Sequence, residues 1–335
     1  MLIGVLGLLV MGYLLESVVG VLMGGGGTGA EEARLEETVV ENNHSGNKIA
    51  VVSIDGIIMS LGRGPYDLVH LVKDQLKSAK ADERVRAVIL KVDSPGGEVL
   101  AADDIARAIA KFQKESGKPV IASMASVAAS GGYYVSAPCR WIVAHELTIT
   151  GSIGVIMQSY NFRGLMDKIG LRPETFKSGK YKDMLSSTKQ ESEITQEERD
   201  MVQKLVNETF EKFKSVVAEG RKQASEKNQA AAEPGRALDA KWAEYADGRV
   251  LSGKQAYELG FVDELGPFET AVDRAKKLAG IKDANLVQFQ PIFNLSSLFR
   301  MFGRADVGRV KVDVGLEVPQ LRAGYLYFLA PNYVH

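Results

Sequence analysis

The sequence predicts an α/β protein in which helices cover a mainly parallel sheet. Strand and helix patterns alternate from Lys48 onward, which is the rhythm of repeated βαβ units. The continuous apolar run Val85–Val92 is typical of a strand that is buried on both faces. The apolar residues of Tyr66–Lys80 recur at helical spacing. With 335 residues, of which 45% are hydrophobic, the chain can bury a sizeable core.

The remaining elements of this pattern follow in order along the chain. We expect strands at Ile49–Ile54, Val85–Val92, Pro119–Met124 and Trp141–Ala144, and helices at Tyr66–Lys80, Glu98–Glu115 and Gly131–Ala137. Thr195 and Glu198 have capping-box spacing, so a long helix should begin there and reach about Gly220. Residues 225–239 are polar and alanine-rich, as in a loop or a solvent-exposed helix. A strand, a helix and a turn are expected over 247–266, and a further amphipathic helix over 269–279.

The character of the chain changes after Ile281. We expect a short helix at 294–302 and an edge strand at 310–318, where apolar residues alternate with polar residues or glycine. The small, apolar tail 323–330 would need a groove to bury it, and we hypothesise that it enters a catalytic groove and is trimmed there.

The N-terminal segment Leu2–Met23 is apolar and long enough to span a bilayer, which needs about 20 residues. A cleaved signal peptide or a buried core helix are the alternatives. No Lys or Arg precedes the segment, so the positive-inside rule gives no orientation, and Glu16 would be costly within it. We therefore divide the chain into an anchor (1–24), a flexible linker (25–47), a catalytic domain (48–280) and a C-terminal strand and tail (281–335).

Composition excludes several classes of function. The net charge of −1 gives no reason to expect nucleic acid as a partner. Cys139 is the single cysteine, which excludes an intrachain disulfide and a cysteine-rich zinc site. The four histidines lack metal-ligand spacing, so no metal and no cofactor are expected, and His145 is interpreted as a surface or loop residue.

Two residues stand out as candidates for chemistry. Ser130 lies among small residues at an expected helix start, where its hydroxyl would be unhindered, and Lys182 lies in the segment 178–183. The segment Asp93–Gly97 joins a strand to a helix, so the amides of Gly97 and Gly131 could together stabilise a developing negative charge. The alternatives are a plain turn at Gly97 and a helix-capping role for Ser130.

Five segments occur in an order that resembles one protein family. They are 93–97, 129–134, 150–155, 178–183, and 247–250 together with 260–266. As a set they resemble the signal peptide peptidase A family (peptidase family S49), which are bacterial membrane-anchored serine proteases. The resemblance covers about residues 48–279, and it implies the Clp-protease and crotonase superfold.

The resemblance implies a role for each site residue. Ser130 matches the nucleophile, Lys182 the general base, Gly97 and Gly131 the oxyanion-hole amides, and Ser152 a residue that hydrogen-bonds the lysine. Lys180 lies two positions before Lys182 and would share its face in an extended segment, so only the family match chooses between them. A free lysine has a pKa of about 10.4 and is charged at neutral pH, so we expect an apolar pocket around the Lys182 amine.

The resemblance also implies partners and a location. It implies signal peptides and other hydrophobic peptides as substrates, membrane lipid around 2–23, a homo-oligomeric ring, and a catalytic domain outside the cytoplasm. Ser130 and Lys182 could meet within one chain or between two, and the absence of an internal repeat favours a shared site. A crotonase-type acyl-CoA enzyme and a non-catalytic membrane scaffold are the competing interpretations.

Overall fold

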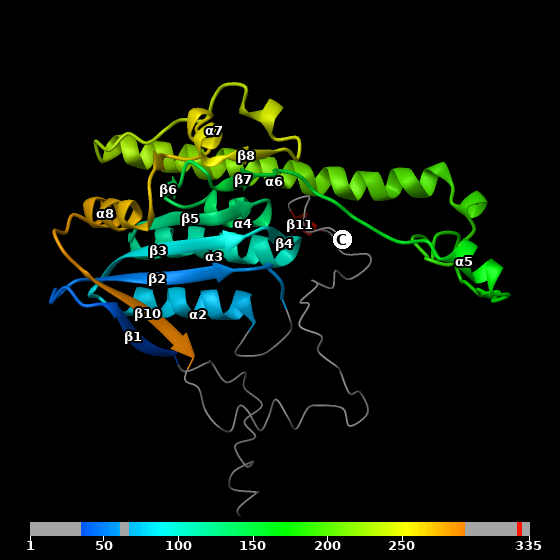
Figure 1. Ribbon diagram of the computed structural model, residues 1–335, viewed down its shortest axis with the longest axis horizontal. Helices are drawn as coiled ribbons and strands as arrows, with labels where there is room; N and C mark the ends of the chain where they lie inside the picture. Colours follow the sequence, from blue (N-terminus) through cyan, green and yellow to red (C-terminus); the bar gives the residue numbers. More distant parts are fainter. Residues whose placement is uncertain (1–34, 61–66, 292–326, 330–335) are drawn as a thin grey trace, which may run out of the picture. The chain divides into compact units, whose positions relative to one another are not determined.

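The computed structural model describes residues 35–60, 67–291 and 327–329, and within them the chain is a mixed α/β protein (Figure 1). Its strands are β1 (Leu35–Glu41), β2 (Lys48–Asp55), β3 (Val85–Ser94), β4 (Gly96–Glu98), β5 (Val120–Ala129), β6 (Trp141–Ala144), β7 (Ile149–Gly151), β8 (Val250–Ser252), β9 (Glu264–Leu265), β10 (Asn285–Pro291) and β11 (Tyr327–Leu329). Its helices are α2 (Leu68–Ala81), α3 (Val99–Ser116), α4 (Gly131–Ser136), α5 (Arg163–Lys168), α6 (Gln196–Ala230), α7 (Gly253–Glu258) and α8 (Phe268–Ala279).

The main sheet has the parallel centre that the strand–helix alternation predicts. Among the described residues its order is β1-β10-β2-β3-β5-β6-β9, and β7 and β8 continue from β5. All pairs from β10 to β9 are parallel, and the antiparallel pairs β1–β10 and β7–β8 lie at the margins. The strands β3 and β5 therefore end side by side, at the edge of a parallel sheet where ligands commonly bind.

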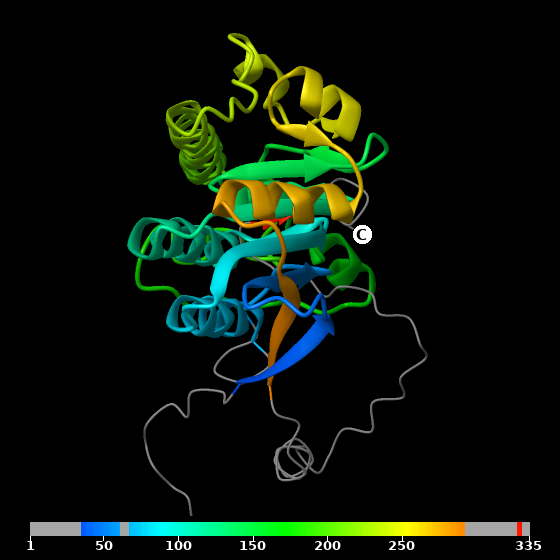
Figure 2. The same cartoon turned by 90° about the vertical axis from the view of Figure 1, so that its left-hand side faces the viewer.

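The two faces of the sheet are covered by different helices (Figures 1 and 2). Along β2, Ala50 and Val52 pack with α2, α3 and α4, whereas Ile49 and Val51 pack with α8 on the other face. This alternation follows from the two-residue period of a strand, and it explains why the core strands are apolar throughout. The helix α3 ends at Gly117, whose φ of 71° is the left-handed conformation favoured after a helix.

The helix α6 is longer than the sequence predicts and joins two unlike regions. The capping box of Thr195 and Glu198 is confirmed, but the helix continues to Ala230 instead of ending near Gly220. Only its second half packs on the core, from Phe210 onward. The first half belongs to an arm, residues 157–209, that includes α5 and lies beyond the edge of the sheet (Figure 1). Residues 225–239 begin as the end of α6 and continue as a loop.

Two expected boundaries are wrong. Within the expected linker 25–47, Leu35–Glu41 forms β1, because its backbone completes the edge of the sheet by pairing with β10. The expected break at 281 falls before β10, which pairs with β2 and belongs to the same sheet. The predicted anchor, the helix at 294–302 and the edge strand at 310–318 lie outside the described residues. None of the described helices is long and apolar enough to cross a bilayer.

Candidate active site

Ser130 stands in a strained turn between β5 and α4. Its φ of 54° and ψ of −115° are rare for a residue with a side chain, and such strain, roughly 1–3 kcal/mol, persists only where the surroundings enforce it. Here the Ser130 amide donates to the Gly151 carbonyl oxygen at 2.8 Å, and the Ser130 carbonyl oxygen accepts from the Tyr134 amide at 2.8 Å. The nucleophile candidate is therefore fixed by the sheet on one side and by a helix on the other.

The Ser130 hydroxyl is buried and has no hydrogen-bond partner among the described residues. Ser130 occupies the position before α4, but its side chain does not cap the helix, so the capping interpretation is wrong. A buried hydroxyl without a partner is energetically unfavourable, and in native structures such a group requires an explanation. A reactive group that waits for its base and its substrate provides one.

The glycines of the candidate oxyanion hole lie next to Ser130. A Cβ atom placed on Gly131 would lie 3.1 Å from the Gly97 nitrogen, so the two backbones are in close contact, as the sequence predicts. A Cβ atom on Gly97 would lie 1.9 Å from the Ile58 carbonyl oxygen, which leaves no room for a side chain there. Backbone amides from two adjacent segments beside a serine are groups that can stabilise an oxyanion.

Gly96 is a further residue of this site that the sequence analysis did not single out, and it permits close backbone packing. Its φ is 104°, and a Cβ atom there would lie 1.8 Å from the Phe328 carbonyl oxygen and 2.6 Å from the Gly131 nitrogen. Only glycine fits such a position, because it lacks the Cβ atom. The first glycine of the Pro95-Gly96-Gly97 turn was the available signal, since paired glycines permit close backbone approach.

The tail segment β11 pairs with β4 beside these glycines. It pairs antiparallel with β4, with Phe328 opposite Gly97, and Tyr327 forms backbone hydrogen bonds of 3.2 Å in both directions with Ile156. Three residues of the expected groove-binding tail are thus held between two extended segments, as an unfolded peptide would be. The Phe328 ring is buried against Tyr134 and Phe213, with ring centroids 4.8 Å and 4.6 Å apart.

Ser152 lies one strand away from Ser130. β5 and β7 are parallel and pair Ala129 with Gly151, so the two serines follow at the ends of neighbouring strands. Ser152 is buried, has a φ of 50°, and donates its amide to the Arg249 carbonyl oxygen at 2.7 Å. The lysine that Ser152 is expected to support is not beside it in a single chain, so its role stays a prediction.

Lys182 lies on the arm. The segment around it is a series of turns and is not extended, and the Lys182 side chain is exposed. Within a single chain, residues 35–60, 67–291 and 327–329 therefore do not provide the expected apolar surroundings of its amine. Lys180 instead turns toward Glu197, with 2.7 Å between the Lys180 Nζ and Glu197 Oε2 atoms. The hydrogen bond to Glu197, together with Tyr181, raises the pKa of Lys180, which disfavours it as a base.

Within one chain the structure does not bring Ser130 and Lys182 together. The loop of Lys182 is fixed to the first turn of α6, at Glu197 and Glu198. From Glu198 to Phe210, where α6 first contacts the core, the helix extends by about 18 Å. Further along α6, Gly220 packs against Ala137, just beyond the helix that Ser130 begins. The helix that follows Ser130 therefore contacts the middle of α6, at Phe213, whereas the base candidate lies beside the first turn of α6.

The other candidates for chemistry lie outside this site. Cys139 is fully buried, and burial raises the pKa of its thiol to about 12, so it cannot act as a nucleophile. His145 accepts a hydrogen bond from the Leu147 amide at 3.2 Å, as a local loop residue does. Within the described residues no group of acidic, histidine or cysteine side chains could hold a metal ion.

Comparisons with known proteins place this chain among peptidases. A family model described as Peptidase family S49 matches residues 112–243 and 234–282. A signal peptide peptidase SppA of Enterococcus faecium is 36% identical over 262 residues, which cover 76% of this chain and 71% of the relative. A protease of Synechocystis is 36% identical over 261 residues, 77% of this chain and 84% of the relative. Protease 4 of Haemophilus influenzae is 33% identical over 253 residues, 74% of this chain and 38% of the relative.

Two solved structures are also similar to this chain, at lower sequence identity. The membrane-bound stomatin-specific protease 1510-N, in a mutant form, matches with a TM-score of 0.41 and 15% identity, over 69% of this chain and 84% of that one. A mutant of ClpP1 from Listeria monocytogenes matches with a TM-score of 0.39 and 16% identity, over 66% of this chain and 94% of that one.

Proposed function

Because this chain belongs to peptidase family S49, it is a serine peptidase, and we propose that it cleaves unfolded apolar peptides with Ser130 as nucleophile and Lys182 of a neighbouring copy as general base. One observation carries the proposal. Ser130 is a buried, strained serine whose hydroxyl has no hydrogen-bond partner in the described part of the chain, and it lies beside the glycine backbones of β4 and α4. Membership of a peptidase family disfavours the acyl-CoA enzyme and the non-catalytic scaffold.

The shared site follows from the arm. Between Gly154 and Lys212 the single buried residue is Glu198, so the arm has no apolar core of its own. Many of its large apolar side chains are exposed instead, namely Tyr160, Phe162, Leu165, Ile169, Leu171, Phe176, Leu185 and Leu205. Burial of such a side chain contributes about 1.5–3 kcal/mol, so a second copy that covers these residues would gain stability. The same contact would bring Lys182 to a Ser130 and remove its amine from water.

The reaction then proceeds in two steps. Neutral Lys182 accepts the Ser130 proton while the Oγ atom bonds to the peptide carbonyl carbon, and the Gly97 and Gly131 amides stabilise the oxyanion. The C–N bond breaks as the leaving amine takes the proton from Lys182, which leaves an acyl-enzyme. Water then attacks the ester with Lys182 again as base, and the acid product and free Ser130 are released. Ser152 would hold the lysine amine between these steps.

Substrates would bind as β11 does. An extended peptide between β4 and Ile156 gains backbone hydrogen bonds that do not depend on sequence. A pocket formed by Tyr134 and Phe213, which holds Phe328 here, selects for apolar side chains. Cleaved signal peptides are such substrates, and the apolar segment 2–23 would anchor the enzyme in the membrane, with its catalytic domain outside the cytoplasm, in a ring of copies.

The Ser–Lys dyad is tested by three alanine variants assayed on a peptide with an apolar centre. Ser130→Ala and Lys182→Ala should each lose at least about 10³-fold in kcat, because the members of such a dyad act as a unit. Lys180→Ala is the matched control and should retain activity close to wild type. Near-normal turnover by either of the first two variants would overturn the dyad.

Trimming of the tail has its own test. If β11 binds as a substrate does, the active protein should lose C-terminal residues with time, and the Ser130→Ala protein should keep them. Mass spectrometry of the two intact proteins measures this. Identical full-length C-termini in both would show that the bound tail is not cleaved.

A further inference from the structure

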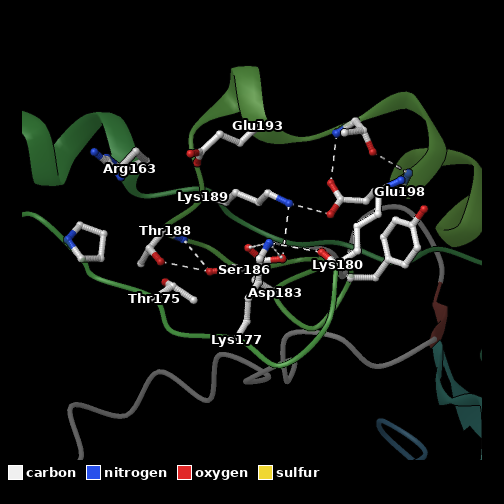
Figure 3. Close-up of a pocket in the computed structure, with 13 residues that line it drawn as sticks. Arg163, Thr175, Lys177, Lys180, Asp183, Ser186, Thr188, Lys189, Glu193 and Glu198 are labelled. Atoms are coloured by element: carbon white, nitrogen blue, oxygen red, sulfur yellow. Dashed lines mark hydrogen bonds and ion pairs between the residues drawn. The ribbon is translucent and has the colours of Figure 1, made fainter.

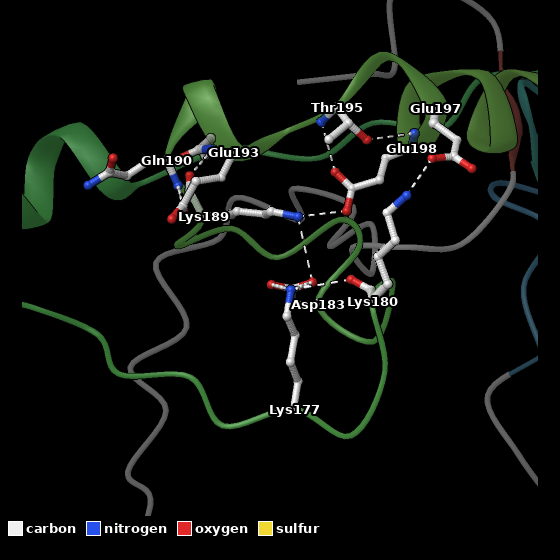
Figure 4. A network of polar contacts seen from close by, with 10 residues as sticks. Lys177, Lys180, Asp183, Lys189, Gln190, Glu193, Thr195, Glu197 and Glu198 are labelled. Carbon is white, nitrogen blue, oxygen red and sulfur yellow. Dashed lines mark hydrogen bonds and ion pairs between the residues drawn. The ribbon is translucent and has the colours of Figure 1, made fainter.

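The single buried residue of the arm is a charged one. Glu198 is 4% exposed, although glutamate is among the residues least often buried without a partner. Its carboxylate divides its two oxygens between two tasks (Figure 4). Oε2 accepts a hydrogen bond from the Thr195 amide at 3.0 Å and so helps to cap α6. Oε1 accepts a hydrogen bond from the Lys189 amine at 2.6 Å. Lys189 is thereby fixed to the rigid first turn of a long helix.

Lys189 also contacts Asp183, the residue that follows the base candidate Lys182. The Lys189 Nζ atom lies 3.6 Å from the Asp183 Oδ1 atom, and Asp183 directly follows Lys182. Lys177 donates to both Asp183 oxygens, at 2.9 Å and 2.8 Å, and to the Lys180 carbonyl oxygen at 3.2 Å. The backbone is therefore held on both sides of Lys182. The Lys182 amine itself has no partner among the described residues.

These side chains surround a hollow of about 420 Å³ (Figure 3). The hollow is not an anion site, because the cations that line it are already paired. Arg163 pairs with Asp167 at 2.9 Å, Lys180 with Glu197, and Lys177 and Lys189 with the carboxylates described above. The hydrogen bond from Lys189 lowers the pKa of Glu198, and the one from Lys177 lowers that of Asp183. Both carboxylates are therefore ionised at neutral pH.

We propose that Lys177, Asp183, Lys189 and Glu198, here called the clamp, are positioning residues that fix the Lys182 loop to α6 so that the lysine projects toward a partner's Ser130. The proposal rests on the proposed function, because it takes Lys182 to be the base. The arm has no apolar core to hold this loop, so the ion pairs supply the geometry. A displacement of about 1 Å in a reacting group can cost 10²-fold in rate.

The first test compares two lysines of the arm in the full-length enzyme. Lys189→Met should lower kcat by about 10- to 100-fold with KM within twofold, because the base is misplaced while the groove is intact. Lys189→Arg, which keeps the charge, should recover most of the rate. Lys204→Met removes an exposed lysine on α6, 3.9 Å from Glu208 and outside the clamp, and should leave kcat unchanged. An unchanged kcat in Lys189→Met overturns the proposal.

The second test distinguishes a positioning role of Lys189 from a role in folding. It mixes two inactive variants, Ser130→Ala and Lys182→Ala, and adds Lys189→Met to one of them at a time. In a mixture, Ser130→Ala subunits donate Lys182 and Lys182→Ala subunits donate Ser130. Lys189→Met in the lysine donor should lower the recovered activity by about 10- to 100-fold, and the same change in the serine donor should preserve it. Equal effects in both positions would overturn the positioning role. An inactive reference mixture would overturn the shared site itself, and kcat of homogeneous Lys189→Met would then decide the clamp.

Discussion

The two halves of the proposed site are held by different physical forces. Ser130 lies in a body whose surroundings are buried sheet, small side chains and backbone hydrogen bonds. Lys182 lies on an arm whose single buried residue is a glutamate and whose loop is fixed by ion pairs. The body buries a large apolar core, whereas the arm exposes many of its large apolar side chains, which marks it as an interaction surface.

The difference suggests how activity is controlled. In the proposed mechanism, each chain supplies its own nucleophile and oxyanion hole, and the base becomes available only when an arm meets another body. Activity should therefore follow assembly and depend on protein concentration. A lone chain would keep a buried serine that is harmless to other proteins.

The largest expected effect on stability comes from the ion pair that fixes α6 to the body. Arg221 and Asp263 are both buried and paired, and Asp263 also accepts the Ile142 amide at 2.8 Å. Arg221→Met leaves this carboxylate buried without its partner, which should lower the free energy of unfolding by about 3–5 kcal/mol. Denaturant unfolding measures the loss. The neighbouring Lys222→Met removes an exposed lysine 3.9 Å from Glu226 and should hardly change the free energy of unfolding. Equal losses of stability in the two variants would contradict the importance of the Arg221–Asp263 ion pair.

The next effect concerns the oxyanion hole of the body. Gly97→Ala places a methyl group against the Ile58 backbone, so β4 must shift and its amide moves away from the oxyanion. Loss of one such donor costs about 2.7–4 kcal/mol in the barrier, so kcat should fall by about 10²–10³-fold. Gly46→Ala is the matched control, since no atom lies within 4 Å of its Cβ position. A Gly97→Ala enzyme with normal kcat would remove Gly97 from the site.

The smallest effect is an acid-induced release of the arm. Ion pairs with lysines lower the pKa values of Asp183 and Glu198 from ordinary values of 3.8 and 4.5. The stability they contribute is present above those ordinary values and is lost as the pH falls through the lowered ones. Hydrogen exchange, corrected for intrinsic rates, should show residues 173–189 protected at pH 5 and open near pH 3, while β5 stays protected. Simultaneous loss in both regions would contradict a separate clamp.

The sequence predicted the body better than the arm. Continuous apolar strands and amphipathic helices leave clear periodic patterns, so β2, β3, β5, β6, α2 and α3 were expected nearly where they lie. Ser130 and Gly97 were recognisable because each lies between a strand and a helix. The arm has no buried apolar face, so periodicity could not outline it or set the length of α6. The pairing of Lys189 with Glu198 depends on the fold of a loop, and no local pattern indicates it.

The edges of the sheet show the same limit. Leu35–Glu41 was expected as linker because it lies in an acidic, polar stretch, yet its backbone pairs with β10, about 250 residues later in the chain. An edge strand of this kind is specified by its partner and not by its own pattern. The position of β11 beside Gly97 likewise depends on a groove formed by distant residues.

The central claim is that one copy supplies Ser130 and another supplies Lys182. A fluorophosphonate probe reacts only with an activated serine, so it can be applied to Lys182→Ala protein alone and to its mixture with Ser130→Ala protein. Mass spectrometry then locates the label. The account predicts that Ser130 of the Lys182→Ala chain is labelled in the mixture and not when that protein is alone. A mixture that stays unlabelled, while wild-type protein is labelled under the same conditions, would contradict it.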